Sequence, residues 1–337
     1  MNIDADAHVI ESESAWDYML ESERQFRPRP VADERDPSIE YWHFDGRLIP
    51  RTNVERKLPQ AARDMSDLSI RIRHMDALSI DIQVIYPTFF IFPTARREAA
   101  DLAICRSYNR WMAERVSRAL ERFRWIVVPP LMNMDRLKEE LRFGKEHGAC
   151  GIYMRGLEGD RRLSDPYFFA LYELATRLDL PICVHSGNGS ITTHDFFLDE
   201  PGFCKFKLAV IGAFHSLVND GIPERFPKLR IGIIEVSAQW IPYAIHDLAR
   251  RHSRRGRQLT ENVLEGNRVY VTCQTDDDLD YLLAYTGEDN LVIGTDYGHS
   301  DNASEIEALR RLREEGKLAP RVVEKILDDN PRALYRI

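Results

Sequence analysis

Eight short apolar runs recur along the chain, and their alternation with segments of helical length restricts the folds open to it. The runs are rich in Val and Ile and cover residues 3–10, 81–87, 124–130, 149–155, 181–187, 229–236, 268–274 and 291–298. Nearly continuous apolar runs are typical of parallel strands that are buried on both faces. Eight such strands, each followed by a helix, predict an α/β fold of the (β/α)₈ TIM-barrel type. A doubly wound open sheet is the alternative.

The segments between the runs carry helical signals. In residues 101–120 an apolar residue recurs every four positions and forms one stripe, made of Ile104, Tyr108, Met112, Val116 and Leu120. A second helix is predicted after Asp165 and Pro166, an N-cap acid followed by proline at the first helical position. Its inward-facing residues are Phe168, Leu171, Ala175 and Leu178.

Two regions interrupt this rhythm. Residues 11–64 are rich in charge, proline and aromatics, and they separate the first strand from its helix. They predict an insertion over the barrel mouth that acts as a lid or binds substrate. Residues 188–204 predict a second extended loop, after the fifth strand. Because no repeat or linker is visible, residues 1–337 predict a single domain.

Composition excludes several classes of function. The net charge of -8 argues against a nucleic-acid partner, which normally selects a basic face. No apolar run approaches the roughly 20 residues of a membrane span, and the N-terminus has no signal pattern. A cytoplasmic protein is therefore expected. The five cysteines are scattered without a CxxC pair, which indicates reduced thiols rather than disulfides or a zinc knuckle.

Polar residues stand at the ends of several predicted strands. Asp6 and His8 close the first, His185 the fifth, Glu235 the sixth and Asp296 the eighth. One such residue alone is explained equally well as a satisfied core group, and the first strand alone as a solvated edge. Because active sites of (β/α)₈ barrels gather at the C-terminal ends of the strands, five such residues predict a common site.

Two imidazoles and two carboxylates at one point are typical of a divalent transition-metal site. Imidazole suits zinc, and carboxylates also accept manganese or iron. Such an ion lowers the pKa of bound water or polarises a substrate oxygen. We expect a catalytic site, because structural zinc sites are usually closed and rich in cysteine.

At this point the motifs resemble a known family. Five stretches of the chain are similar to motifs of the amidohydrolase-related metal-dependent hydrolases. They are Asp6-x-His8, VHSG with His185, IPERFPKLRIGIIE, GTDYGH with Asp296 and the closing ILDDNPRALYRI. The branch typified by aminocarboxymuconate-semialdehyde decarboxylase is the most similar. The resemblance covers nearly the whole chain and implies a (β/α)₈ barrel with a divalent metal at its mouth.

The resemblance also implies a ligand set. It assigns Asp6, His8, His185 and Asp296 to one metal ion, and it makes Asp296 a proton acceptor for water as well. Asp6 stands where many members have histidine or glutamate. Binuclear relatives carry a carboxylated lysine at the end of the fourth strand, whereas this strand ends with Arg155. A single ion is therefore expected, zinc first, with manganese or iron as alternatives.

One departure bears on the reaction. Decarboxylases of this branch typically carry a histidine at the end of the sixth strand, where this chain has Glu235. A glutamate accepts a proton from water or binds the metal. We therefore expect a hydrolase acting on a small organic acid, ester, thioester or related carbonyl compound, with Glu235 and Asp296 as catalytic residues. Decarboxylation of an aromatic or unsaturated carboxylate is the alternative, and a non-catalytic ligand-binding barrel is the third.

Three further residues are candidates for binding a small-molecule substrate. Arg155 is placed to hold a carboxylate, or alternatively to pair with a nearby acid. His299 borders the site or caps the last helix, and Arg51 is a lid residue that reaches down from the insertion. For Asp4 the sequence allows two roles: a hydrogen-bond partner behind the site, or an anchor of the start of the first strand. No membrane or nucleic-acid partner is expected, and a homodimer is the commonest assembly for such an enzyme.

Overall fold

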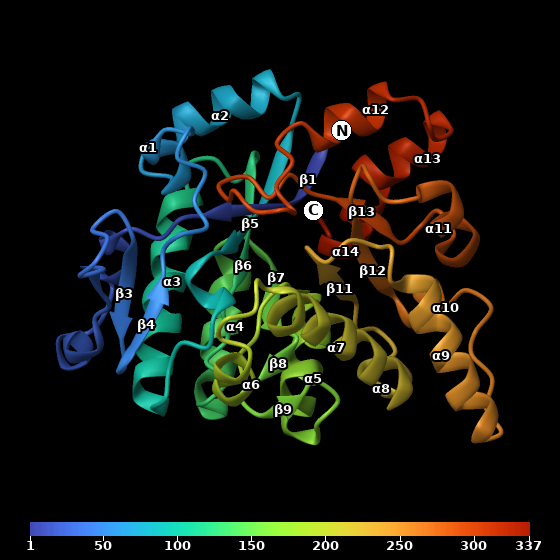
Figure 1. Ribbon diagram of the computed structural model, residues 1–337, viewed down its shortest axis with the longest axis horizontal. Helices are drawn as coiled ribbons and strands as arrows, with labels where there is room; N and C mark the ends of the chain where they lie inside the picture. Colours follow the sequence, from blue (N-terminus) through green and yellow to red (C-terminus); the bar gives the residue numbers. More distant parts are fainter.

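Eight parallel strands form the centre of the computed structural model, which describes residues 1–337 (Figure 1). In order around the sheet they are β1 (Ile3–Val9), β5 (Ile82–Pro87), β6 (Phe123–Val127), β7 (Ala149–Arg155), β10 (Ile182–His185), β11 (Ile231–Ile234), β12 (Val269–Cys273) and β13 (Leu291–Ile293). Each predicted run overlaps one of these strands. The predicted TIM barrel is confirmed, and the open-sheet alternative is excluded.

The barrel closes between its first and last strands through a small number of contacts. Ala7 and Tyr297 form an isolated parallel bridge, and His8 N donates to Tyr297 O over 2.8 Å. Asp296 N donates to Asp6 O over 2.9 Å. The junction therefore brings the C-terminal ends of β1 and β13, with their aspartates, side by side.

Helices surround the strands (Figure 1). The longer ones are α2 (Leu68–Ala77), α3 (Glu98–Val116), α4 (Leu137–Glu146), α5 (Phe169–Leu178), α7 (Leu208–Asn219), α9 (Ile241–Arg254) and α11 (Leu279–Thr286). The shorter ones are α1 (Gln60–Arg63), α6 (Ile191–Phe196), α8 (Ile222–Arg225), α10 (Val263–Asn267), α12 (Ala308–Glu314), α13 (Pro320–Glu324) and α14 (Asn330–Tyr335). None of the helices has the combination of length and apolar character that crossing a membrane requires.

The two predicted helices form with small differences at their ends. The stripe of α3 is buried except for Leu120, which lies beyond the end of the helix. Asp165 caps a short 3₁₀ turn, η5 (Pro166–Phe168), by accepting from Tyr167 N, and α5 follows directly. Leu178 is only partly buried because it is the last residue of α5.

The insertion at residues 11–64 has a sheet of its own. Two 3₁₀ turns, η1 (Glu13–Trp16) and η2 (Glu21–Phe26), precede the antiparallel strands β2 (Arg29–Ala32), β3 (Glu40–Phe44) and β4 (Arg47–Pro50). The sheet lies beside α3 (Figure 1). It is anchored by aromatic packing, since the rings of Trp16 and Trp42 lie 5.0 and 6.3 Å from that of Phe89.

The segment 188–204 differs from the extended loop that we predicted. It contains α6, because Ser190 caps this helix by accepting from Thr193 N. A π-helical turn, η6 (Phe203–Lys207), then leads into α7. The remaining short elements are η3 (Phe89–Ile91), η4 (Met134–Arg136), η7 (Lys325–Asp329) and the hairpin of β8 (Leu157–Glu158) and β9 (Arg161–Arg162).

Candidate active site

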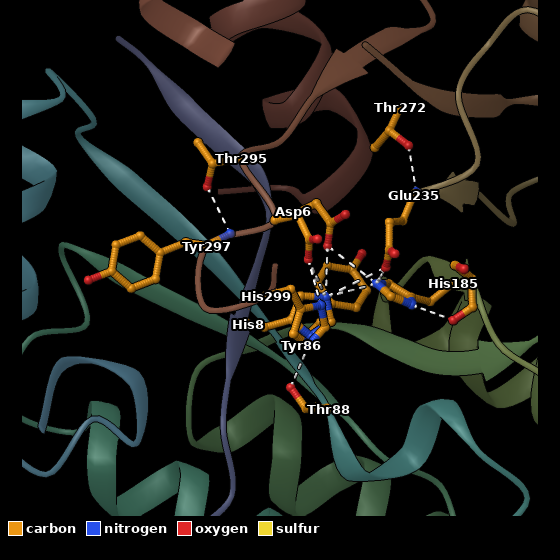
Figure 2. Close-up of polar contacts among 12 residues, drawn as sticks. Asp6, His8, Tyr86, Thr88, His185, Glu235, Thr272, Thr295, Tyr297 and His299 are labelled. Carbon is orange, nitrogen blue, oxygen red and sulfur yellow. Dashed lines mark hydrogen bonds and ion pairs between the residues drawn. The ribbon is translucent and has the colours of Figure 1, made fainter. Parts of the chain in front are cut away.

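Buried polar side chains converge at the C-terminal end of the barrel (Figure 2). Asp6 and His8 come from β1, His185 is the last residue of β10, and Glu235 directly follows β11. His8 Nε2 lies 3.1 Å from His185 Nε2, which lies 2.8 Å from Glu235 Oε2 and 3.4 Å from Asp6 Oδ1. One ligand atom from each of the four residues lies within 4.8 Å of the other three. We name these four residues the donor cluster.

Asp296 adjoins the donor cluster from the far end of the chain. Its Oδ1 lies 3.4 Å from His8 Nε2 and 2.7 Å from the Nδ1 of His299. Its other oxygen accepts from the Ser304 hydroxyl over 2.6 Å. The imidazole of His299 stacks on that of His8 with ring centroids 3.8 Å apart. The structure thus brings together all five strand-end residues that the sequence singled out.

The backbone at two of these positions is left-handed. Glu235 has φ 63° and Asp296 has φ 52°, values that are uncommon for residues other than glycine. Both peptide groups are held in place, because Glu235 N donates to Thr272 Oγ1 over 2.7 Å and Asp296 N donates to Asp6 O. Backbone strain of this kind clusters at functional positions.

The donor cluster fits a divalent cation. Asp6 Oδ1, Glu235 Oε2 and Asp296 Oδ1 are buried and make no hydrogen bond, although each lies near a histidine nitrogen. Leaving such acceptors unsatisfied is costly, and a cation among them removes that cost. His185 Nδ1 lies 2.8 Å from the Ser186 carbonyl, so Nδ1–H donates to it and Nε2 is left free to bind a metal. The residue types are those that zinc and manganese bind.

The protonation of the cluster reflects its burial. Burial raises the pKa of Glu235 to about 8, although the charge of His185 opposes the shift. Burial also raises the pKa of Asp296 to about 6, against the opposing effect of His299. Burial lowers the pKa of His299, but the Asp296 carboxylate outweighs it and raises the value to about 9. Without a metal ion, the site therefore holds protons close to neutral pH.

A cavity of about 990 Å³ opens next to these residues. Glu235, Thr88 and Asp301 are among its lining residues, so it reaches the donor cluster. Its walls include several aromatic side chains, among them Trp42, Phe89, Phe92, Phe203, Phe206 and Trp240. The insertion contributes Trp42 and residues 50–54. A flat apolar ligand with one polar group suits such a cavity.

The three predicted substrate-binding residues have different surroundings. Arg51 lines the cavity, with its guanidinium 4.4 Å from the Trp42 ring centroid and 3.2 Å from Glu40. Arg155 does not line it, because its guanidinium is paired with Glu158 at 2.5 Å and donates to two backbone carbonyls. The structure thus favours the alternative in which Arg155 pairs with a nearby acid. His299 is buried behind Asp296 rather than in the cavity wall.

Several residues around the site carried no signal in the sequence. Glu11 accepts from the amides of Thr88 and Phe89, Thr88 contacts His299, and Ser304 contacts Asp296. All of these contacts join segments that are distant in sequence or lie in irregular turns. Only Thr88 had a signal that could have found it, its position directly after the predicted strand at residues 81–87.

Asp4 is an anchor for the barrel junction. It accepts from Thr295 N over 2.9 Å, from the Thr295 hydroxyl over 2.6 Å and from Gln83 Nε2 over 2.9 Å. Burial raises its pKa to about 7, although these hydrogen bonds lower it. Asp4 therefore ties β1 to the segment that carries Asp296.

Comparison with known proteins identifies a family and several similar folds. The family model described as amidohydrolase matches residues 3–337. An amidohydrolase from Mycobacterium avium subsp. paratuberculosis K-10 is 19% identical, with a TM-score of 0.79, and the match covers 100% of this chain and 98% of that chain. A 5-carboxyvanillate decarboxylase from Novosphingobium aromaticivorans with bound manganese is 19% identical, with a TM-score of 0.72 and coverages of 100% and 97%. A 2,6-dihydroxybenzoate decarboxylase from Rhizobium is 16% identical, with a TM-score of 0.66 and coverages of 99% and 98%.

Proposed function

Because the chain belongs to the amidohydrolase family, we propose that this enzyme is a divalent-metal-dependent decarboxylase of an aromatic carboxylate. Three observations support the proposal. The fold is similar over its whole length to two decarboxylases of aromatic acids. The cavity beside the donor cluster is lined in part by aromatic side chains. The cavity reaches the donor cluster at Glu235, and an acid adjoins the donor cluster at Asp296; this last observation carries the proposal.

The acid is the pair formed by Asp296 and His299. Asp296 Oδ1 and His299 Nδ1 lie 2.7 Å apart as an ion pair, and the carboxylate raises the pKa of His299 to about 9, so the pair holds a proton at neutral pH. The second oxygen of Asp296 already accepts from Ser304. Asp296 therefore has little capacity to take a proton from water, as the predicted hydrolysis requires. It is better placed to deliver a proton, as decarboxylation requires.

The proposed reaction breaks the bond between the ring carbon and the carboxylate. The electron pair stays on the ring, CO₂ leaves, and the ring carbon takes the proton from Asp296. Asp6, His8, His185 and Glu235 would hold the metal, which supplies a Lewis acid for the oxygen atoms of the substrate. Glu235 thus takes the ligand position that we predicted for Asp296. The aromatic walls orient the ring and exclude water.

The residues around the site also bear on the number and the identity of the metal ions. We propose a single ion, since Arg155 at the end of β7 is engaged with Glu158 and offers no bridging ligand. Zinc is the first expectation from two imidazoles. Manganese suits the two carboxylates equally, and it is the ion in the structure of the 5-carboxyvanillate decarboxylase.

Product analysis tests the proposal. The protein, loaded in turn with zinc and manganese, is incubated with 5-carboxyvanillate and with dihydroxybenzoates, and CO₂ release is measured before and after chelation. We expect release that depends on the metal, and we expect Asp296→Asn to lower kcat by about 10²–10⁴-fold. A matched panel of esters, lactones and thioesters tests hydrolysis. Turnover of that panel without release of CO₂ from any carboxylate would contradict the proposal.

A further inference from the structure

A second cavity, of about 590 Å³, lies beside the larger one, and it is rich in arginine. Arg51, Arg56 and Arg63 line it, and we name it the arginine pocket. Its walls come from the insertion, from α1 and from the segment after β1. Arg51 and Glu11 line both cavities, so the arginine pocket adjoins the cavity that reaches the donor cluster.

Two of the three guanidinium groups have no acid partner. Arg63 is partly buried at the end of α1, and its Nε is buried without a hydrogen-bond partner. Arg56 is more exposed, and its guanidinium donates to a single backbone carbonyl, that of Ser38, over 3.2 Å. A guanidinium offers five N–H donors in a fixed plane. Most of the donors of Arg56 and Arg63 are therefore free to bind a ligand in the pocket.

The acids that line the arginine pocket are engaged with other groups. Glu40 pairs with Arg51 at 3.2 Å. Glu11 accepts from two backbone amides, and Asp64 accepts from the amide of Ser66 over 2.9 Å. The pocket therefore supplies no carboxylate that pairs with Arg56 or Arg63.

The electrostatics of Arg63 agree with a missing anion. Burial lowers the pKa of Arg63, and the charge of Arg56 acts in the same direction, whereas Asp64 opposes both. Two neighbouring cations without a paired acid gain from an anion that binds both of them. A planar guanidinium matches the oxygen atoms of a carboxylate or a phosphate, which it binds through two parallel hydrogen bonds.

We propose that the arginine pocket binds an oxyanion through Arg56 and Arg63. The oxyanion has one of two sources. It is a free anion from solution, or it is a second anionic group on a substrate whose reacting end lies in the adjoining cavity. The site itself does not rest on the proposed function; only the second source does, and it would narrow the substrate to an aromatic acid with a distal carboxylate or phosphate.

Titration calorimetry with sulfate tests the free-anion source on the manganese-loaded protein at constant ionic strength. We expect sulfate to bind, and its affinity to fall about tenfold in Arg56→Gln and in Arg63→Gln. Arg24→Gln is the matched control, because Arg24 is an exposed arginine of the insertion that pairs with Glu21 and lines neither cavity. Its affinity for sulfate should equal that of the wild type. Urea denaturation of each variant verifies that it is folded.

The second source is tested with benzoate and with benzoates that carry a second carboxylate on flexible chains of increasing length. Calorimetry measures their binding to the same protein, so no turnover is needed. If the substrate supplies the anion, one chain length binds about tenfold more tightly than benzoate, and Arg63→Gln removes this gain while its affinity for benzoate is unchanged.

The two titrations together decide the proposal. Sulfate binding without a gain from the second carboxylate assigns the pocket to a free anion, and the gain without sulfate binding assigns it to the substrate. The absence of both effects overturns the proposal, as do losses of equal size in Arg24→Gln. A failure of the proposed function would appear as absence of CO₂ release, which neither titration uses.

Discussion

Single residues at the strand ends set how the site responds to pH. The raised pKa values of Glu235, about 8, and Asp296, about 6, mean that protons occupy these carboxylates when no metal is bound. A metal ion must displace the protons, so its affinity falls as pH falls through these values. We expect the affinity for manganese to rise steadily between about pH 6 and pH 8, with proton release on binding.

Calorimetry in buffers of different ionisation enthalpy measures the affinity for manganese and the number of protons released on binding. Glu235→Gln is the matched control, since it keeps the shape of the side chain and removes the group with the higher pKa. The variant should bind manganese more weakly at pH 8 and show a flatter dependence on pH. An affinity that does not change across this range in the wild type would contradict the assignment of Glu235 as a ligand.

A substitution of Arg155 can distinguish a role in stabilising the fold from a role in binding substrate. Its pair with Glu158 is buried, with side-chain exposures of 13% and 3%. Removing one member of a buried pair leaves an uncompensated charge, which typically costs about 3–5 kcal/mol. We expect Arg155→Ala to lower the free energy of unfolding by that amount, measured by urea denaturation, with KM little changed. A large rise in KM without loss of stability would restore the substrate-binding role.

At the scale of secondary structure, the junction of β1 and β13 is the weakest part of the barrel. It has one isolated bridge. The Asp4 side chain adds two hydrogen bonds across the junction, from Thr295, and one from Gln83 of β5. Asp4→Ala leaves Thr295 and Gln83 without their acceptor. We expect it to lower the free energy of unfolding by about 2–4 kcal/mol and to weaken metal binding, because Asp6 and Asp296 meet at this junction.

Asp4→Asn separates the hydrogen bonds of Asp4 from its charge. The amide keeps the shape and one acceptor oxygen, so denaturation should show a smaller loss than for Asp4→Ala. Burial of the charged form costs free energy above the unfolded pKa of 3.8, and this cost grows as pH rises toward about 7. The difference in stability between Asp4→Asn and the wild type should therefore shift in favour of the variant as pH rises. A constant difference between pH 4 and pH 8 would argue against the raised pKa.

The barrel strands were readable from the sequence because burial on both faces leaves a continuous apolar run. The insertion sheet was not, since all four residues of β2 are exposed and β3 buries only Trp42 and Phe44. Asp6, His8, His185, Glu235 and Asp296 were found because strand ends in a barrel must meet. The contacts of Thr88, His299 and Ser304 depend on the left-handed turn at Asp296 and on pairings across the barrel, which no local pattern specifies.

For the molecule as a whole, the donor cluster links parts of the chain that are far apart in sequence. Its ligands come from β1, β10 and the turn after β11, and the adjoining Asp296 follows β13. An ion that binds only the folded protein stabilises all of these elements at once, by about 2.7 kcal/mol at a concentration 100 times its Kd. For a chain of 337 residues this corresponds to a rise in Tm of about 4 °C.

Calorimetric melting at increasing zinc or manganese concentrations measures this linkage. We expect Tm to rise with the logarithm of the ion concentration in the wild type, and to stay constant in His185→Asn, which removes a ligand from the donor cluster. Arg155→Ala is the matched control, because its melting temperature should be lower but should rise with the ion as in the wild type. A rise of equal size in His185→Asn would mean that the ion binds elsewhere, since a ligand from β10 would then contribute nothing to its stabilising effect.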